Sequence, residues 1–230
     1  MKKLFFALFI AITAIAYAQN NQFLQSQRCY GGTLVDIAWS IQQTKDGGYI
    51  VAGYTRSKNR QVSGNHGYYD YWIVKLKSNG RIQWEKCFGG KKDDEAISIQ
   101  QTKDGGYIVA GESSSKDGNV SGHHGSTDYG DYWIVKLNAT GTIEWQNTIG
   151  GTNDDYLNVI RQTPDGGYIC GGYSASGISG DKTENCLGLD DYWIVKTDSA
   201  GNIQWQNTIG GNNYDKLNSI QQTVDGGYIL

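Results

Sequence analysis

The chain has 230 residues and a formal net charge of −3 at pH 7, with acidic and basic residues interleaved along it. A mildly acidic protein without a basic stripe is poorly suited to bind phosphate backbones, so we expect no nucleic-acid partner. After the N-terminal segment no second long apolar stretch occurs, which argues against an integral membrane protein.

Residues 1–18 read as a signal peptide. Lys2 and Lys3 form a basic start, residues 4–16 are an apolar run, and Ala16-Tyr17-Ala18 has the small-x-small pattern that signal peptidase cleaves after. The apolar run is too short to span a bilayer comfortably. No Cys lies at the cleavage point, so we expect no lipid anchor. The short start is typical of bacterial signals and predicts a secreted or cell-surface protein with no integral membrane segment after cleavage.

A repeat of about 60 residues follows. Asp-Gly-Gly-Tyr-Ile starts at Asp46, Asp104, Asp165 and Asp225, at intervals of 58, 61 and 60 residues. Asp-Tyr-Trp-Ile-Val-Lys starts at Asp70, Asp131 and Asp191. Self-similarity at a fixed period of this length indicates a repeat architecture with one supersecondary unit per period.

Each copy contains four predicted strands joined by tight turns. In the second copy the strands are 94–102, 107–111, 131–137 and 142–149. Residues 103–106, Lys-Asp-Gly-Gly, predict a hairpin turn, because Asp-Gly and Gly-Gly tolerate the positive φ that such turns require. Tyr132-Trp133-Ile134-Val135 is apolar on both faces of its strand, as a sheet covered on both sides requires. The pattern predicts an all-β chain, a β-propeller of four-stranded antiparallel blades.

The expected domain organisation is a signal peptide at 1–18 and propeller repeats at 19–230. Residues 24–32 match 82–90 in register, which predicts a lone closing strand ahead of the first blade. Leu230 falls inside the second strand of the fourth copy, so we expect a fragment: an open arc of three whole blades plus part blades, with exposed edges. The expected blades are 33–90, 91–151, 152–211 and the start of a fourth at 212–230.

Four phrases recur in order at fixed spacing: Gly-Gly-Tyr-Ile-Val-Ala-Gly, Ser-Gly-Asn-His-Gly, Asp-Tyr-Trp-Ile-Val-Lys-Leu and Ile-Gln-Trp. Over essentially all of residues 24–230 the chain resembles bacterial β-propeller repeat proteins, most of all those of the secreted Bacteroidetes type. The resemblance implies an exported, surface or extracellular propeller, often joined to sorting or adhesion-type domains. The family carries no well-defined activity, so the resemblance implies fold and location only.

Two sets of aspartates recur in the repeats and could be taken for ligand or cation sites. The first set follows a Gly-Gly pair by four residues, and the second opens the third strands: Asp36, Asp94, Asp155 and Asp215; Asp70, Asp131 and Asp191. A single active site needs blade-specific residues, whereas a residue present in every copy serves the repeat itself. We therefore expect these carboxylates to accept backbone N–H bonds at loop entrances.

The long loop between strands two and three is the best location for a specific site. In residues 115–125, Asp117-Gly118-Asn119 has the alternation of a short Ca²⁺ loop but lacks the full ligand set and the distal Glu. We expect no cofactor, with Ca²⁺ in this loop as the one alternative. His66, His123 and His124 are the only histidines, and we expect them to be solvent-exposed loop residues rather than zinc ligands.

No catalytic constellation is recognisable. There is no Ser/His/Asp set, and sequence-adjacent pairs such as Asp93-Asp94 point apart on a strand. Cys29 and Cys87 occupy equivalent places in different blades, too far apart to bridge. Cys170 reads as a core residue, and a Cys170–Cys186 disulfide is conceivable.

The leading hypothesis is an exported non-catalytic propeller, a scaffold or binding module for a carbohydrate, a matrix polymer or a protein ligand. Binding would use the variable loops on one rim and the Tyr or Trp side chains exposed there. The first alternative is a fragment of a propeller enzyme, a polysaccharide lyase or glycosidase whose catalytic residues lie in blades outside this sequence. The second is a purely structural spacer. No catalytic residue or metal ligand is assigned, and the ligand-binding residues stay unknown.

Overall fold

The computed structural model describes residues 27–230, which contain strands, turns and loops and no helix. The chain divides into two units, residues 1–30 and residues 31–230. Of the first unit only 27–30 are described, and they are not part of a strand. The signal segment, its cleavage site and residues 24–26 lie outside the described residues, so the closing strand at 24–32 stays a prediction.

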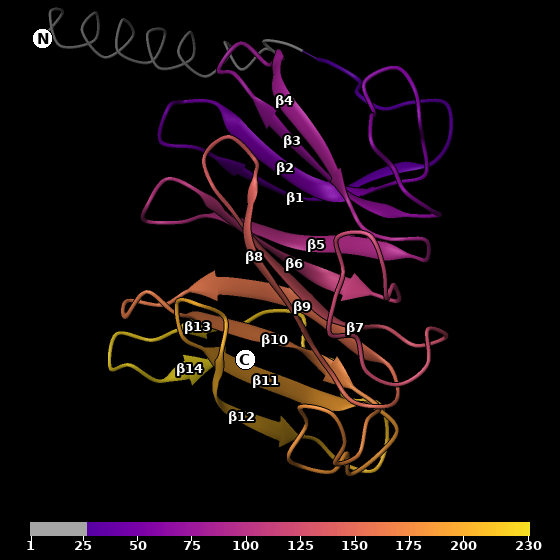
Figure 1. The fold of residues 1–230 in the computed structure, drawn as a ribbon. Coiled ribbons are helices and arrows are strands. Elements are labelled where there is room, and N and C mark those ends of the chain that lie inside the picture. The colour runs from indigo at the N-terminus through magenta and orange to yellow at the C-terminus, as the bar shows by residue number, and fades with distance from the viewer. Residues whose placement is uncertain (1–26) are drawn as a thin grey trace, which may run out of the picture. The chain divides into compact units, whose positions relative to one another are not determined.

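Residues 31–230 build three four-stranded antiparallel sheets, each with its strands in chain order (Figure 1). The first contains β1 (Asp36–Gln43), β2 (Tyr49–Thr55), β3 (Asp70–Leu76) and β4 (Ile82–Phe88). The second contains β5 (Asp94–Gln101), β6 (Tyr107–Ser113), β7 (Asp131–Leu137) and β8 (Ile143–Ile149). The third contains β9 (Asp155–Gln162), β10 (Tyr168–Ser174), β11 (Asp191–Thr197) and β12 (Ile203–Ile209). The predicted four-stranded blade is confirmed, although β6 runs two residues beyond the predicted end at Gly111.

The Asp-Tyr-Trp motif joins each sheet to the next one. Successive strand residues point to opposite faces, so Tyr and Trp of one motif face different neighbours. The Tyr71 ring lies 4.5 Å from the Trp133 ring, and the Tyr71 hydroxyl donates to the Trp133 carbonyl at 2.9 Å. Tyr132 repeats both contacts with Trp193. Both of these tryptophans are fully buried, as a strand that is apolar on both faces requires.

The Asp-Gly-Gly hairpin forms an ion pair with the lysine next to the end of the apolar third strand. In the second sheet, Asp104 accepts the Gly106 N–H at 2.9 Å, and Gly105 adopts a φ of 89°. The buried Lys136 ammonium lies 2.9 Å from the Asp104 carboxylate. A buried ammonium needs such a partner, which explains why the hairpin aspartate and the strand lysine recur together.

The fourth repeat contributes only β13 (Gln221–Gln222) and β14 (Tyr228–Ile229). Its short sheet leaves part of the third sheet uncovered: Ile209 is 47% exposed, whereas its counterpart Ile149 in the second sheet is 0% exposed. Residues 31–230 are therefore an open arc of three whole blades plus a part blade, and no sheet in it is closed on itself.

Candidate functional site

The first set of repeated aspartates holds the loop entrances together. Asp94 accepts the Gly90 N–H at 2.7 Å and the Ser115 hydroxyl at 2.9 Å, and it also accepts the Ser113 hydroxyl. Asp36 and Asp155 accept the same kinds of bonds in their own blades. The predicted structural function of these carboxylates is confirmed.

The second set of repeated aspartates binds each long loop to the start of the third strand that follows it. Asp70 accepts the His66 N–H at 2.9 Å, and Asp131 accepts the His124 N–H at 2.6 Å. Asp191 accepts the Leu187 N–H in the same way. Each carboxylate is buried, so these bonds connect the start of every third strand to its preceding loop.

Burial of Asp131 predicts that stability falls as the pH rises toward about 8. Desolvation, together with the charges of Asp155 and Asp181, raises the pKa of Asp131 to about 8, although the bond from the His124 N–H opposes the shift. An acid with a raised folded pKa stabilises the fold below its unfolded pKa, and this contribution is lost as the pH rises toward the folded pKa. Urea titrations between pH 6.5 and 8.5 should therefore show a falling midpoint.

Asp131→Asn is the control, because it removes one titrating group and should make this dependence shallower. Asp94, whose pKa burial raises to about 7, accounts for part of the slope that remains. The hairpin aspartates do not interfere: the pKa of Asp165 is lowered to about 2 by the Thr163 hydroxyl and Lys196, so its effect lies at acidic pH. A midpoint that rises between pH 6.5 and 8.5 would contradict the prediction.

The expectation that all three histidines are solvent-exposed is wrong for two of them. The His123 side chain is 0% exposed and that of His124 is 28% exposed, while His66 is more open at 40%. The loop is drawn over Asp131, which places His123 Nδ1 3.5 Å and His124 Nδ1 3.4 Å from its carboxylate. Among residues 27–230, no group of three His, Cys, Asp or Glu side chains is arranged to hold a metal ion.

The Asp117-Gly118-Asn119 alternation has a structural explanation. Asp117 Oδ1 accepts the Lys91 N–H at 2.8 Å, and Asn119 Oδ1 accepts the Gly89 N–H at 3.2 Å. Gly118 takes a φ of 67°, which lets the loop approach the Gly-Gly backbone closely. The oxygens that suggested a Ca²⁺ loop thus bind the preceding turn.

The four cysteines are free thiols. Cys170 is fully buried in the core of the third sheet, as predicted. Cys186 instead donates to the Ser174 carbonyl at 3.4 Å, so the conceivable Cys170–Cys186 disulfide is not formed.

A blade-specific site lies elsewhere, at the rim where the first strands begin and the second strands end. In the first sheet Tyr54 packs edge-to-face on Tyr69, with ring centroids 5.1 Å apart. The second sheet has Glu112 and Gly130 at these two positions. A Cβ on Gly130 would lie 3.1 Å from Glu112 Oε2, so the space beside this carboxyl depends on glycine. The two replacements exchange an aromatic pair for a buried carboxyl group beside a glycine.

Neighbouring blades surround this position with acids and phenols. Glu95 is the cross-strand partner of Glu112 and interacts with the Tyr54 side chain of the first sheet. In the third sheet Tyr156 stacks on Tyr173 at 5.0 Å, and the charge of Glu112 acts on both phenols. We call Glu95, Glu112, Gly130, Tyr54 and Tyr156 the rim site.

The electrostatics of the rim site favour a protonated Glu112. Burial raises the pKa of Glu112 well above its usual range, and the charge of Glu95 raises it further. Burial and the charge of Asp93 also raise the pKa of Glu95. Glu112 Oε2 is buried and has no hydrogen-bond partner among the residues that the structure describes. A neutral Glu112 beside Glu95 can both donate and accept hydrogen bonds.

Sequence reasoning missed this site, although a signal was present. At the end of the second strand, copies one and three read Tyr-Thr and Tyr-Ser where copy two reads Glu112-Ser113. The repeated aspartates were the more conspicuous acidic residues, but they accept backbone N–H bonds that hold the loops in place.

No protein-family model matches the chain, and no curated protein matches its sequence. In the described part of the chain no helix is long and apolar enough to cross a membrane. The function must therefore be argued from the residues of the rim site.

Proposed function

We propose that the chain is an exported binding module that takes a carbohydrate ligand at the rim site. The observation that carries this proposal is the replacement of the Tyr54–Tyr69 pair of the first blade by Glu112 and Gly130 in the second. The third blade keeps the first tyrosine, as Tyr173, and has Asp190 at the second position. Export rests on the signal-like residues 1–18 and on the resemblance to secreted Bacteroidetes-type repeats.

The chemistry of the site fits a hydroxyl-rich ligand. Ligand sites combine apolar or aromatic walls with a few polar groups that fix orientation. Tyr54 and Tyr156 supply phenol rings, while Glu95 and Glu112 supply donors and acceptors for sugar hydroxyls. A buried, unpartnered carboxyl oxygen gains from a hydroxyl that satisfies it, because an unmade bond is costly.

The second candidate is a glycosidase that uses the same site. Its support is the pair of carboxyl groups with raised pKa on adjacent strands, since glycoside hydrolysis uses two carboxyl groups, one of them kept protonated. A scaffold or spacer without a ligand would not need this pair of carboxyl groups.

Glu112→Gln tests the proposal by calorimetric titration with soluble neutral polysaccharides. We expect at least a tenfold loss of affinity, about 1.4 kcal/mol, because one carboxyl donor and acceptor is replaced. The fold should persist, because Gln resembles the neutral acid that burial favours at this position. The double variant Glu112→Tyr with Gly130→Tyr rebuilds the pair of the first blade and should abolish binding.

Glu144→Gln is the matched control. It makes the same chemical change at a Glu bound to Lys136, and the third blade naturally has Gln204 bound to Lys196 at that place. Unchanged affinity in both Glu112 variants would overturn the proposal. Release of reducing ends by the wild type, lost in Glu112→Gln, would establish the glycosidase instead.

A further inference from the structure

The first strands of neighbouring blades are joined by a short ladder of side chain–backbone hydrogen bonds. Between β1 and β5, Ser40 Oγ accepts the Ile99 N–H at 3.3 Å, and Gln42 Oε1 accepts the Gln101 N–H at 2.6 Å. Gln101 Oε1 in turn accepts the Lys45 N–H at 2.9 Å. The ladder therefore needs a side-chain acceptor at the positions of Ser40 and Gln42 and a backbone N–H at the position of Lys45.

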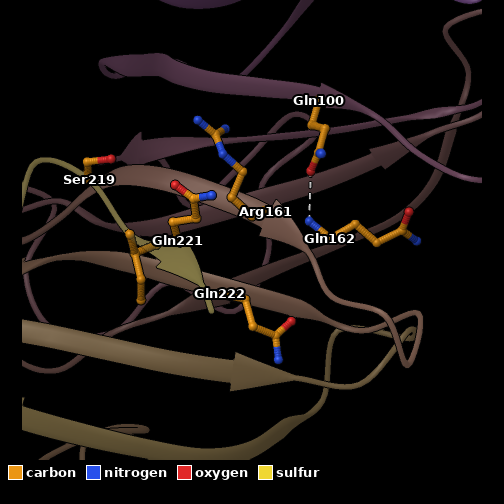
Figure 2. A pocket seen from close by; sticks show the side chains of 7 residues that line it. Gln100, Arg161, Gln162, Ser219, Gln221 and Gln222 are labelled. Carbon is orange, nitrogen blue, oxygen red and sulfur yellow. Dashed lines mark hydrogen bonds between the residues drawn. The ribbon is translucent and has the colours of Figure 1, made fainter. Parts of the chain in front are cut away.

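The next junction repeats the ladder in the same register. Between β5 and β9, Ser98 Oγ accepts the Ile160 N–H at 3.3 Å, and Gln100 Oε1 accepts the Gln162 N–H at 2.7 Å (Figure 2). Gln162 Oε1 accepts the Lys103 N–H at 2.9 Å. Two junctions thus use identical chemistry.

The third junction lacks all three groups. Val159 stands in place of the serine, Arg161 in place of the glutamine acceptor, and Pro164 in place of the lysine N–H. Valine and arginine side chains have no acceptor, and proline has no N–H, so none of the three bonds can form. The facing strand β13 is only two residues long, against eight in β5 and β9.

A cavity of about 310 Å³ opens at this junction (Figure 2). Among residues 27–230, Arg161 is the only charged residue that lines it, and the other polar lining residues are Gln100, Gln162, Ser219, Gln221 and Gln222. Its volume lies at the lower end of small-molecule sites.

The Arg161 guanidinium is available to a ligand. It donates one hydrogen bond, from Nη1 to the Ile160 carbonyl at 3.1 Å, and residues 27–230 contain no ion pair with it. A guanidinium has five N–H donors in a fork that matches a carboxylate or a phosphate. Four donors therefore remain for an oxyanion.

We propose that this cavity binds an acidic sugar, with its carboxylate on Arg161 and its hydroxyls on the glutamine amides. One guanidinium balances one carboxylate charge, whereas a phosphate dianion would need a second cation. No second cation from the described part of the chain lines the cavity. Amide groups donate and accept, as hydroxyls require. The cavity is a second site, separate from the rim site, because Arg161 lies near the opposite end of β9 from Tyr156.

Titration of the full chain with D-galacturonate tests the proposal by calorimetry, with D-galactose and inorganic phosphate as comparison ligands. We expect galacturonate to bind at least tenfold more tightly than either one, with an affinity that falls as the salt concentration rises. Arg161→Gln restores the residue of the first two blades and should remove the preference for galacturonate. Arg81→Gln, at an exposed hairpin arginine, should leave it unchanged.

A second variant separates loss of the site from loss of the fold. Val159→Ser, Arg161→Gln and Pro164→Lys together restore the ladder, so this variant should unfold at a higher urea concentration and fail to bind galacturonate. No galacturonate binding by the wild type, equal binding by Arg161→Gln, or tighter binding of phosphate would overturn the proposal. Glu112→Gln should leave galacturonate binding intact, so a failure of the rim site is distinguishable from a failure here.

Discussion

Replacing Trp193 with Ala is expected to lower the free energy of unfolding by about 3–5 kcal/mol, the usual cost of removing a buried tryptophan. The Trp193 ring is fully buried against Tyr132 of the preceding sheet, with centroids 4.8 Å apart. Its indole Nε1 donates to Gln206 at 3.0 Å, and the variant leaves that acceptor unpaired. Urea denaturation followed by circular dichroism measures the loss.

Trp205→Ala is the matched control, because this tryptophan is exposed and contacts Tyr228 only at its edge. The Trp205→Ala variant should lose less than half as much free energy of unfolding as Trp193→Ala, since less apolar surface returns to water on truncation. Equal losses for the two variants would show that the third strand does not fill the layer between blades.

Gly111→Ala should cost about 3 kcal/mol, at the upper end of the cost of overpacking. A Cβ at Gly111 would lie 1.9 Å from the backbone oxygen of Glu95 on the paired strand. The obstacle is backbone, so no side-chain rotation relieves it, and the strands would have to separate at the bulge between Ala96 and Ser98. Thermal and urea unfolding both report this loss.

Gly105→Ala separates the clash from the general cost of replacing glycine. Nothing lies within 4 Å of a Cβ at this hairpin position, and only its φ of 89° opposes the change. That backbone strain costs roughly 1–2 kcal/mol. If Gly105→Ala destabilises as much as Gly111→Ala, close approach of the two strands is not what requires glycine at position 111.

Sequence reasoning was most successful where the determining interactions are local. The hairpin at 103–106 and the strand at 131–137 appear in the structure with their predicted bounds, because turn residues and strand alternation act over a few residues. Burial of Trp133 also followed from the sequence, since a strand that is apolar on both faces needs cover on both.

The rim site and the burial of His123 could not be predicted from local sequence patterns. The sequence shows that Glu112 departs from the tyrosine of the other copies, but Gly130 lies 18 residues away, and only the pairing of strands places the two together. The burial of His123 likewise depends on a loop drawn in by Asp131.

By itself the sequence determined the repeat, the four strands of each copy and their turns, because backbone preferences and apolar periodicity are local properties. Only the tertiary structure decided which departures from the repeat matter. Val159, Arg161 and Pro164 are unremarkable in a strand and a turn, but packing of successive blades makes their positions the donors and acceptors of one ladder. An open polar cavity lies beside Arg161 at this junction, between blades whose equivalent residues are about 60 positions apart.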